Sequence, residues 1–290
     1  MTALRDIARA KLNLTLEVLG RLPDGFHEIQ SLVAFAGVGD TVELTPGNGV
    51  ELAVEGPFAA ALSGDNLITK AAEAAKAANP ELRLGRFRLD KVLPVAAGLG
   101  GGSADAAAAL RLIARTNGGI PSEAELTAFA TKLGLDVSVC LKSKPAMITG
   151  RGEKVEFVRG FPSCGVLLAN PRVLLATAAV YGSLNAKPLA SLSALKPQLP
   201  QFDGSFEKLV AYILPRGNHL ELPAARLVPE IREVLAALLA LPGASVARLS
   251  GSGPTCFALF ATEDEAKRAA VTLAAQRPAW WVAAAALLPS

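Results

Sequence analysis

The residues Leu93–Asp105, LPVAAGLGGGSAD, join a predicted strand to a predicted helix. Side chains alternate in character over Phe87–Leu93, which predicts the strand, and Ala104–Arg115 is an alanine-rich run that predicts the helix. Glycines allow the backbone between them to approach a ligand closely. The first N–H groups of a helix lack acceptors within the helix and point outward. This order of elements therefore predicts an anion site whose natural ligand is phosphate.

The glycine loop differs from three familiar phosphate loops. No lysine follows its glycines, as a P-loop requires, and Ser103 stands where the dinucleotide-binding fingerprint has its last glycine. The glycine loop of protein kinases lies between two hairpin strands, whereas this one opens a helix. A simple helix-entry turn is the alternative, but three consecutive glycines carry an entropic cost that a turn rarely needs. We therefore expect Gly98–Ser103 to bind phosphate.

Length and composition limit the fold class. The chain has 290 residues, of which 51% are hydrophobic and 19% charged, so a sizeable core is available. With 26 Gly and 19 Pro it has too many turn residues for a helical bundle, and α/β or α+β remains. We expect two domains, 1–155 with the phosphate loop and 156–290. Within the first, the pattern predicts separate strands over Ile29–Phe35 and Asp40–Thr45.

Charge and cysteine content point to a soluble, cytoplasmic protein. The net charge is +3, too small a bias for a nucleic-acid or membrane-surface partner. The three cysteines have no zinc-type spacing and lie in apolar stretches, which predicts buried thiols. The N-terminus has no apolar segment of a signal peptide, and Trp280–Leu288 is too short to span a bilayer.

Three further segments add candidate functional residues. Lys11 and Asn13 share one face of a predicted strand, although a lysine there could also extend to solvent at the strand end. Asp136 lies in an apolar run, where a helix-capping carboxylate is the alternative. Ser250–Pro254 is a second glycine loop, which alone could be any turn.

These four segments, in this order, resemble the GHMP kinase superfamily. Further elements resemble its branch that acts on 4-diphosphocytidyl-2-C-methyl-D-erythritol: Ala10–Leu14, Gly20-Arg21, Asp24–His27, Gly39-Asp40, Asp65–Ile68 and Gly98–Ala106. The resemblance implies a two-domain α+β fold, with an N-terminal domain like domain 2 of ribosomal protein S5 and a ferredoxin-like C-terminal domain. It also implies transfer of the ATP γ-phosphoryl group to the 2-hydroxyl of that substrate, a step of non-mevalonate isoprenoid precursor synthesis.

The resemblance assigns roles by position. Lys11 and Asp136 match the catalytic lysine and aspartate. The ATP-binding positions are Asn66, Pro94, Gly98, Leu99, Gly100, Gly101, Gly102 and Ser103. The substrate-binding positions are Asn13, Phe26, His27, Asp136, Thr177 and Tyr181, with the aromatic residues stacking on cytosine and His27 bonding to its edge. Mg²⁺ is expected with ATP, held by phosphate oxygens and water rather than by protein residues. The chain is expected to be a monomer or a weak homodimer.

The sequence departs from the family pattern at a few positions. Phe26 replaces the usual Tyr, which keeps the ring for stacking but loses a hydroxyl. Ala104 replaces the second of two serines after the glycines and removes a hydroxyl from the phosphate or magnesium sphere. Arg9 and Ser138 each replace a proline.

Three rival functions remain at this stage. Another kinase of the superfamily would act on homoserine, mevalonate or a sugar, but these substrates have no base for Phe26, His27 and Tyr181 to bind. A non-catalytic ligand sensor could keep the glycine loops and lose Lys11 or Asp136, and both are present. A nucleic-acid-binding protein with an S5-like domain would need a basic patch, which a net charge of +3 does not support.

Overall fold

The computed structural model describes residues 2–62, 64–189 and 199–290. The chain forms two compact units, each built from several segments. The first unit contains the chain up to Ala10, with Gly39–Val95 and Gly100–Ser143, and the second contains Lys11–Val38, Ala96–Leu99 and the chain from Lys144 onward. The long strands β1 (Leu4–Asn13) and β3 (His27–Gly47) therefore contribute residues to both units. A domain boundary at residue 155 stays a prediction.

β3 is one strand where the sequence predicted two. The expected break between Ile29–Phe35 and Asp40–Thr45 is wrong, because β3 runs without interruption from His27 to Gly47. Gly39, which lies between the two predicted strands, does not form a turn and instead allows close packing. A side chain at Gly39 would overlap the backbone of Ala8, so glycine is what lets β1 lie this close to β3.

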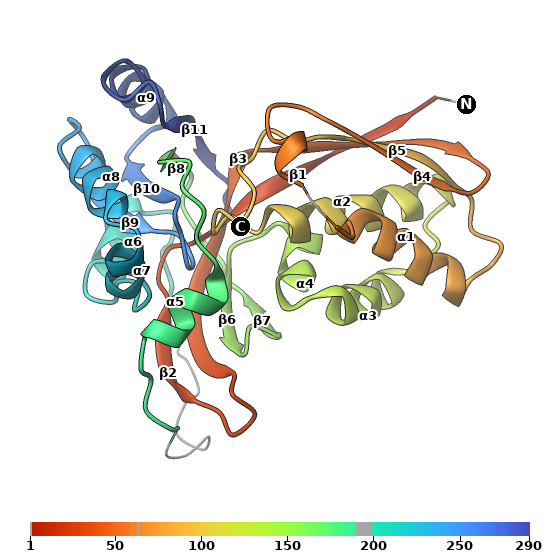
Figure 1. The fold of residues 1–290 in the computed structure, drawn as a ribbon, viewed down its shortest axis with the longest axis horizontal. Helices are drawn as coiled ribbons and strands as arrows, with labels where there is room; N and C mark the ends of the chain where they lie inside the picture. Colours follow the sequence, from red (N-terminus) through yellow and green to blue (C-terminus); the bar gives the residue numbers. More distant parts are fainter. Residues whose placement is uncertain (1, 63, 190–198) are drawn as a thin grey trace. The chain divides into compact units, whose positions relative to one another are not determined.

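In the first unit, strands and helices form two layers. β3 pairs antiparallel with β5 (Leu84–Asp90), and β5 pairs parallel with β4 (Val50–Glu55). A short 3₁₀ turn, Ala59–Ala61, follows β4. The α-helices are α1 (Leu67–Ala78), α2 (Gly101–Thr116), α3 (Glu123–Leu133) and α4 (Leu135–Lys142), and they lie together on one side of β4 and β5 (Figure 1).

Local sequence explains where these helices begin. The Asn66 side chain caps α1 by accepting a hydrogen bond from the Ile68 N–H. Ser122 and Glu125 form the capping box of α3. Helix α2 begins at Gly101, three residues before the predicted Ala104, because Gly100 takes the left-handed conformation and supplies the N-cap.

In the second unit, four strands pair antiparallel in the order β11–β8–β10–β9, and β11 also pairs with β3 through Leu287 and Ala36. Besides its parts of β1 and β3, the second unit contains the strands β2 (Glu17–Arg21), β6 (Ala146–Gly150), β7 (Lys154–Phe157), β8 (Cys164–Asn170), β9 (Val246–Leu249), β10 (Cys256–Phe260) and β11 (Trp281–Leu287). Its helices are α5 (Thr177–Ser183), α6 (Phe206–Ile213), α7 (Glu221–Leu227), α8 (Glu230–Leu239) and α9 (Glu263–Gln276). β6 pairs with β7 and with β3, and β2 pairs with β3.

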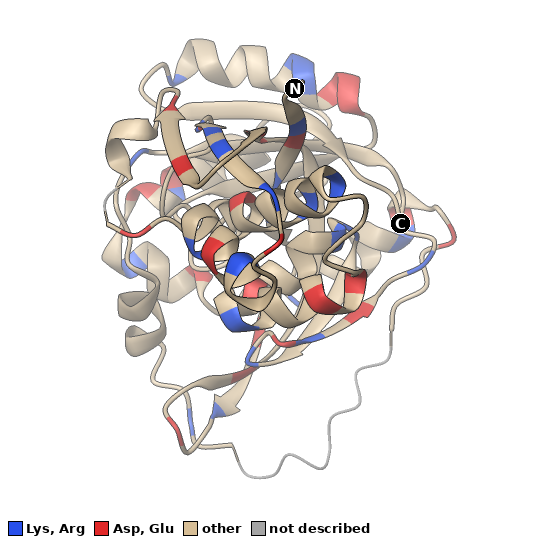
Figure 2. Ribbon diagram, turned by 90° about the vertical axis from the view of Figure 1, so that its right-hand side faces the viewer, with Lys and Arg blue, Asp and Glu red and all other residues tan. Residues whose placement is uncertain are grey.

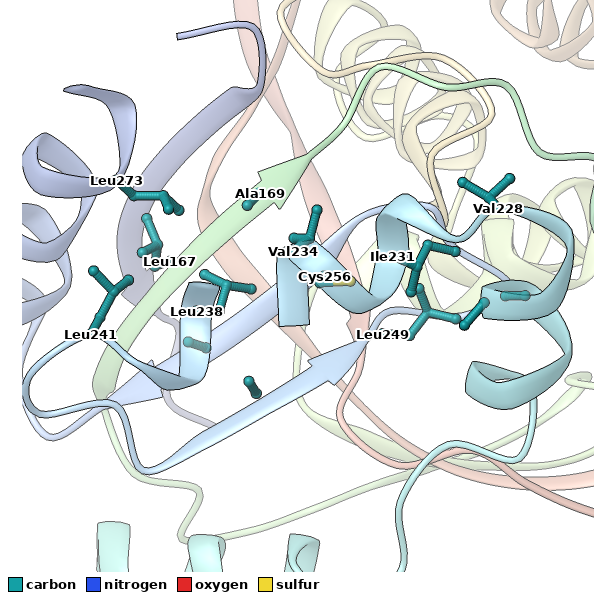
Figure 3. Packing of buried hydrophobic residues seen from close by; sticks show 14 of the residues in the cluster. Leu167, Ala169, Val228, Ile231, Val234, Leu238, Leu241, Leu249, Cys256 and Leu273 are labelled. Atoms are coloured by element: carbon teal, nitrogen blue, oxygen red, sulfur yellow. The ribbon is translucent and has the colours of Figure 1, made fainter. Parts of the chain in front are cut away.

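Buried aliphatic side chains hold this second unit together. Figure 3 shows Leu167 of β8, Val234 and Leu238 of α8, and Leu249 of β9 packed in one cluster. Leu167, Val234, Leu238 and Leu249 are fully shielded from solvent. Removing such a leucine side chain to Ala costs about 2–5 kcal/mol, so this cluster fixes the strands that carry the loops described below.

The buried thiols agree with the expectation from the sequence. In the ribbon of Figure 2, Lys and Arg positions are interspersed with Asp and Glu positions. Cys140, Cys164 and Cys256 are buried, as predicted, and burial raises the pKa of Cys164 to about 12. Among the described residues, no helix is both long and apolar enough to cross a membrane.

Candidate active site

The start of α2 is built to present free backbone amides. Its N-cap, Gly100, has φ +62° and offers no side chain to cap the helix. The amides of Gly101, Gly102 and Ser103 belong to the first turn, where N–H groups lack acceptors within the helix and favour an anion. A turn of this kind suits an anion, and binding of phosphate there stays a prediction.

The start of α1 lies beside this turn. A Cβ at Gly102 would lie 3.7 Å from Leu67 Cδ1, an ordinary contact distance. Leu67 follows Asn66, whose Oδ1 accepts from the Ile68 N–H at 2.8 Å and whose carbonyl accepts from Thr69 Oγ1 at 2.7 Å. The structure thus brings Asn66 near the glycine turn and shows it as a helix cap. Its contact with adenine stays a prediction.

The first half of the glycine loop, in the second unit, is fixed by the second glycine loop. Ser250 Oγ donates to the Gly98 carbonyl at 2.8 Å, and the Thr255 N–H donates to the Ala97 carbonyl at 3.3 Å. Gly98 has φ +74°, and a side chain there would overlap the Ser250 carbonyl oxygen. Ser250–Pro254 is therefore a supporting loop rather than an unrelated turn.

The end of β1 meets the same loops. The Lys11 N–H donates to the Leu99 carbonyl at 2.8 Å. Asn13 Nδ2 donates to Ser31 Oγ at 2.8 Å, and a Cβ at Gly251 would lie 3.2 Å from Asn13 Oδ1. Lys11 is only 5% exposed, so the alternative that it extends to solvent at the strand end is wrong.

Asp136 lies in the first turn of α4, which begins after Gly134, and its side chain is partly buried. A carboxylate in a first turn interacts favourably with the helix dipole. Asp136 and α4 belong to the first unit, and Lys11 belongs to the second. The shared catalytic role expected of Asp136 and Lys11 therefore stays a prediction.

Two predicted base-binding residues lie together in the second unit. The ring centroids of His27 and Tyr181 lie 5.0 Å apart, and the two ring planes are inclined by 34°. Burial, together with the charge of Arg21, lowers the pKa of His27, so its imidazole is neutral at pH 7 and can both donate and accept a hydrogen bond. Thr177, one turn before Tyr181 on α5, has its Oγ1 2.8 Å from Ser252 Oγ.

Phe26 occupies a different environment from the other aromatic residues. Its ring is 53% exposed, and the Arg151 guanidinium lies 5.1 Å from the ring centroid. Arg151 also pairs with Asp24, whose Oδ1 accepts from the Phe26 N–H at 3.1 Å. The structure thus holds Phe26 in an ordered turn, with one ring face against a cation.

The sequence interpretation missed three residues that organise these loops. Ser250 belongs to a glycine loop noted in the sequence, but its bond to Gly98 spans 152 positions. Asn218 Nδ2 donates to the carbonyls of Leu249 and Gly251 at 2.9 and 2.8 Å. Neither Asn218 nor Arg151 lies in a recognisable motif, so no local signal could have identified them.

ATP fits the α2 turn, because helix-start amides without a side-chain cap suit an anionic phosphate chain. The described residues contain no group of three or more His, Cys, Asp or Glu that could hold a metal ion.

Comparison with known proteins gives the family. The model of the GHMP kinases N terminal domain matches residues 66–144, and that of the GHMP kinases C terminal matches 199–278. A 4-diphosphocytidyl-2-C-methyl-D-erythritol kinase of Parvibaculum lavamentivorans is 46% identical over 279 residues, which is 96% of each chain.

Solved structures agree with this match. A crystal structure of 4-(cytidine 5'-diphospho)-2C-methyl-D-erythritol kinase is similar with a TM-score of 0.77 and 31% identity, covering 99% of this chain and 100% of the other. A homoserine kinase from Cytophaga hutchinsonii has a TM-score of 0.69 and 17% identity over 99% and 95% of the two chains, which shows a shared fold alone. The two-domain α+β fold expected from the motifs is confirmed, and the chain belongs to the GHMP kinase family.

Proposed function

We propose that this chain is an ATP-dependent kinase that transfers the γ-phosphoryl group of ATP to the 2-hydroxyl of 4-diphosphocytidyl-2-C-methyl-D-erythritol, in the non-mevalonate route to isoprenoid precursors. The relatives that share 46% and 31% identity over nearly the whole chain carry that kinase name. The observation that carries the proposal is the pair of rings at 5.0 Å, His27 and Tyr181. Two such rings can bind a nucleotide base, whereas homoserine and mevalonate have no base to bind.

Phosphoryl transfer requires positioning and charge stabilisation more than covalent chemistry from the protein. The amides at the start of α2 bind the β- and γ-phosphates and stabilise charge that develops on the transferring group. Mg²⁺, when bound with ATP, supplies further neutralisation of phosphate charge. Gly98, Leu99 and Pro94 contribute by shaping the backbone of the loop.

Two charged residues act on the reacting groups in this proposal. Asp136 orients the 2-hydroxyl and accepts its proton as the phosphoryl group is transferred. Lys11 supplies a positive charge that stabilises the charge developing on the transferring phosphoryl group.

The cytidine end of the substrate is recognised by the residues from the second unit. His27, neutral at pH 7, hydrogen-bonds to the polar edge of cytosine. Tyr181 and Phe26 offer ring faces to the base, and stacking requires only the ring. Asn13 and Thr177 supply polar contacts. We further propose that the chain acts in the cytoplasm as a monomer or weak homodimer, without a membrane or nucleic-acid partner.

The test is a coupled assay of ADP release with the cytidine diphosphate substrate beside homoserine, mevalonate and galactose. We expect release with the cytidine diphosphate substrate alone. Release with one of the other acceptors alone would overturn the choice of substrate. No release with any acceptor would favour the ligand-sensor alternative.

A further inference from the structure

A buried ion cluster in the first unit has no role in the function described so far. It consists of Lys91, directly after β5, Asp40 of β3 and Asp105 of α2. Lys91 Nζ donates to Asp40 Oδ2 at 2.6 Å and to Asp105 Oδ2 at 2.7 Å. The three side chains are 2%, 0% and 4% exposed. Burying three ionisable groups is costly, and loss of one member leaves the others unpaired.

One side of the cluster fixes the entry to the phosphate loop. Asp40 Oδ1 accepts hydrogen bonds from the N–H groups of Val92 and Leu93 at 2.7 and 2.8 Å. These two residues come directly before Pro94. The Lys91 backbone is itself fixed, since its N–H donates to the Glu55 carbonyl at 2.8 Å.

The other side of the cluster fixes the exit from the loop. Asp105 lies four residues after Gly101 on α2, so the two share a helix face. A Cβ at Gly101 would lie 3.1 Å from Lys91 Nζ, so the first residue of the helix packs directly on the ammonium group. Both ends of the stretch from Val92 to Gly101 are therefore attached to one cluster.

Electrostatics makes Lys91 the central member of the cluster. Burial disfavours its ammonium, but the carboxyl groups of Asp105 and Asp40 outweigh this effect and raise the pKa of Lys91. Burial also raises the pKa of Asp105 to about 7, against the effect of Lys91. Asp105 Oδ1 has no hydrogen-bond partner within the described part of the chain. The Lys91 ammonium group thus bridges the two carboxyl groups.

We propose that Lys91, Asp40 and Asp105 are positioning residues for ATP, which hold the first turn of α2 so that its amides face the phosphates. The inference rests on the proposed kinase function, because it assigns the phosphates to that turn. A solely structural cluster would contribute to stability without regard to which part of the nucleotide is bound. A positioning cluster affects the phosphate chain and leaves binding of the nucleoside nearly unchanged.

The test compares the affinity for ATP with the affinity for adenosine in the double variant Lys91→Met/Asp105→Asn. This variant removes one cation and one carboxyl group, so the formal charge of the cluster is kept. We expect ATP to bind at least about tenfold more weakly, whereas adenosine affinity changes less than about twofold. At saturating ATP, kcat should stay within about threefold of wild type, so the loss falls on KM for ATP.

Two further variants keep the result interpretable. Ile113→Ala removes a fully buried side chain farther along α2 and lowers stability without touching the cluster, so its ATP and adenosine affinities should match wild type. Asp40→Asn keeps an oxygen for the Val92 and Leu93 amides but turns a donor toward Lys91. This variant should also bind ATP more weakly than wild type, and it replaces the double variant in the test if the double variant does not fold.

Each outcome decides one of the two claims. Unchanged ATP affinity in the folded variants, or equal weakening of ATP and adenosine, would overturn the positioning role. Loss of ATP affinity in Ile113→Ala equal to that in the double variant would also overturn it. A third outcome separates the two claims. If the wild-type protein releases no ADP with the cytidine diphosphate substrate, but the variants still lose ATP affinity selectively, only the proposed kinase function is refuted.

Discussion

Substitution of Gly98 by Ala tests whether the second glycine loop holds the first. Gly98 has φ +74°, a conformation that costs a residue with a Cβ about 1–2 kcal/mol. The added methyl group would also overlap the Ser250 carbonyl, so the loop must move. Movement breaks the bond from Ser250 Oγ to the Gly98 carbonyl and the bond from the Lys11 N–H to the Leu99 carbonyl. At about 1 kcal/mol for each bond, the total is about 3–4 kcal/mol.

Gly49→Ala is the matched control. Gly49 has φ +76°, but a Cβ there would meet no atom within 4 Å. It therefore carries the conformational cost of about 1–2 kcal/mol and no overlap. Equilibrium unfolding in urea gives both free energies, and the ATP dependence of ADP release gives KM. We expect Gly98→Ala to lose about 2 kcal/mol more than Gly49→Ala and to raise KM for ATP, which Gly49→Ala leaves unchanged. Equal losses, with KM unchanged in both variants, would refute the assignment of Ser250–Pro254 as a supporting loop.

Three further predictions concern chemistry, substrate binding and pH. Asp136→Ala should reduce kcat by orders of magnitude while ATP binding, measured by calorimetry, persists. Phe26→Ala should raise KM for the cytidine diphosphate substrate without changing KM for ATP, measured by initial rates. Asp105 has its pKa raised to about 7 in the folded chain, so it lowers stability as pH rises from about 4 to about 7, by up to about 1.4 kcal/mol per pH unit. Asp105→Asn should remove this slope in urea unfolding across that range.

Contrary results are equally specific. Turnover near the wild-type value in Asp136→Ala would exclude the carboxylate from proton transfer. An unchanged KM in Phe26→Ala would remove its ring from base recognition. A parallel pH dependence of unfolding in wild type and Asp105→Asn would show that this carboxyl group has an ordinary pKa.

Features set by neighbouring residues could be predicted from the sequence. The capping box of Ser122 and Glu125 is confirmed, because a cap depends on residues only three positions apart. The order of strand, glycine loop and helix is also as predicted, although β5 spans Leu84–Asp90 instead of Phe87–Leu93 and α2 starts earlier, at Gly101. The family motifs predicted the fold correctly, because they combine several such local signals.

Features set by packing could not be predicted. The uninterrupted β3 depends on the close approach of Ala8 to Gly39, a contact that periodicity does not report. Lys91 meets Asp40 across 51 positions and Asp105 across 14. A lysine near the end of a predicted strand is ordinarily exposed, so only the fold shows that this one is buried between two carboxyl groups.

The central claim is transfer of the ATP γ-phosphoryl group to the 2-hydroxyl of the cytidine diphosphate substrate. Phosphorus NMR of the reaction mixture tests it most directly, because it identifies the new phosphate ester as well as ADP. We predict a new monophosphate ester at the 2-position, formed in step with ADP, and none with mevalonate or homoserine in its place. A product phosphorylated at another position, or ADP formed only with free inorganic phosphate, would contradict the account.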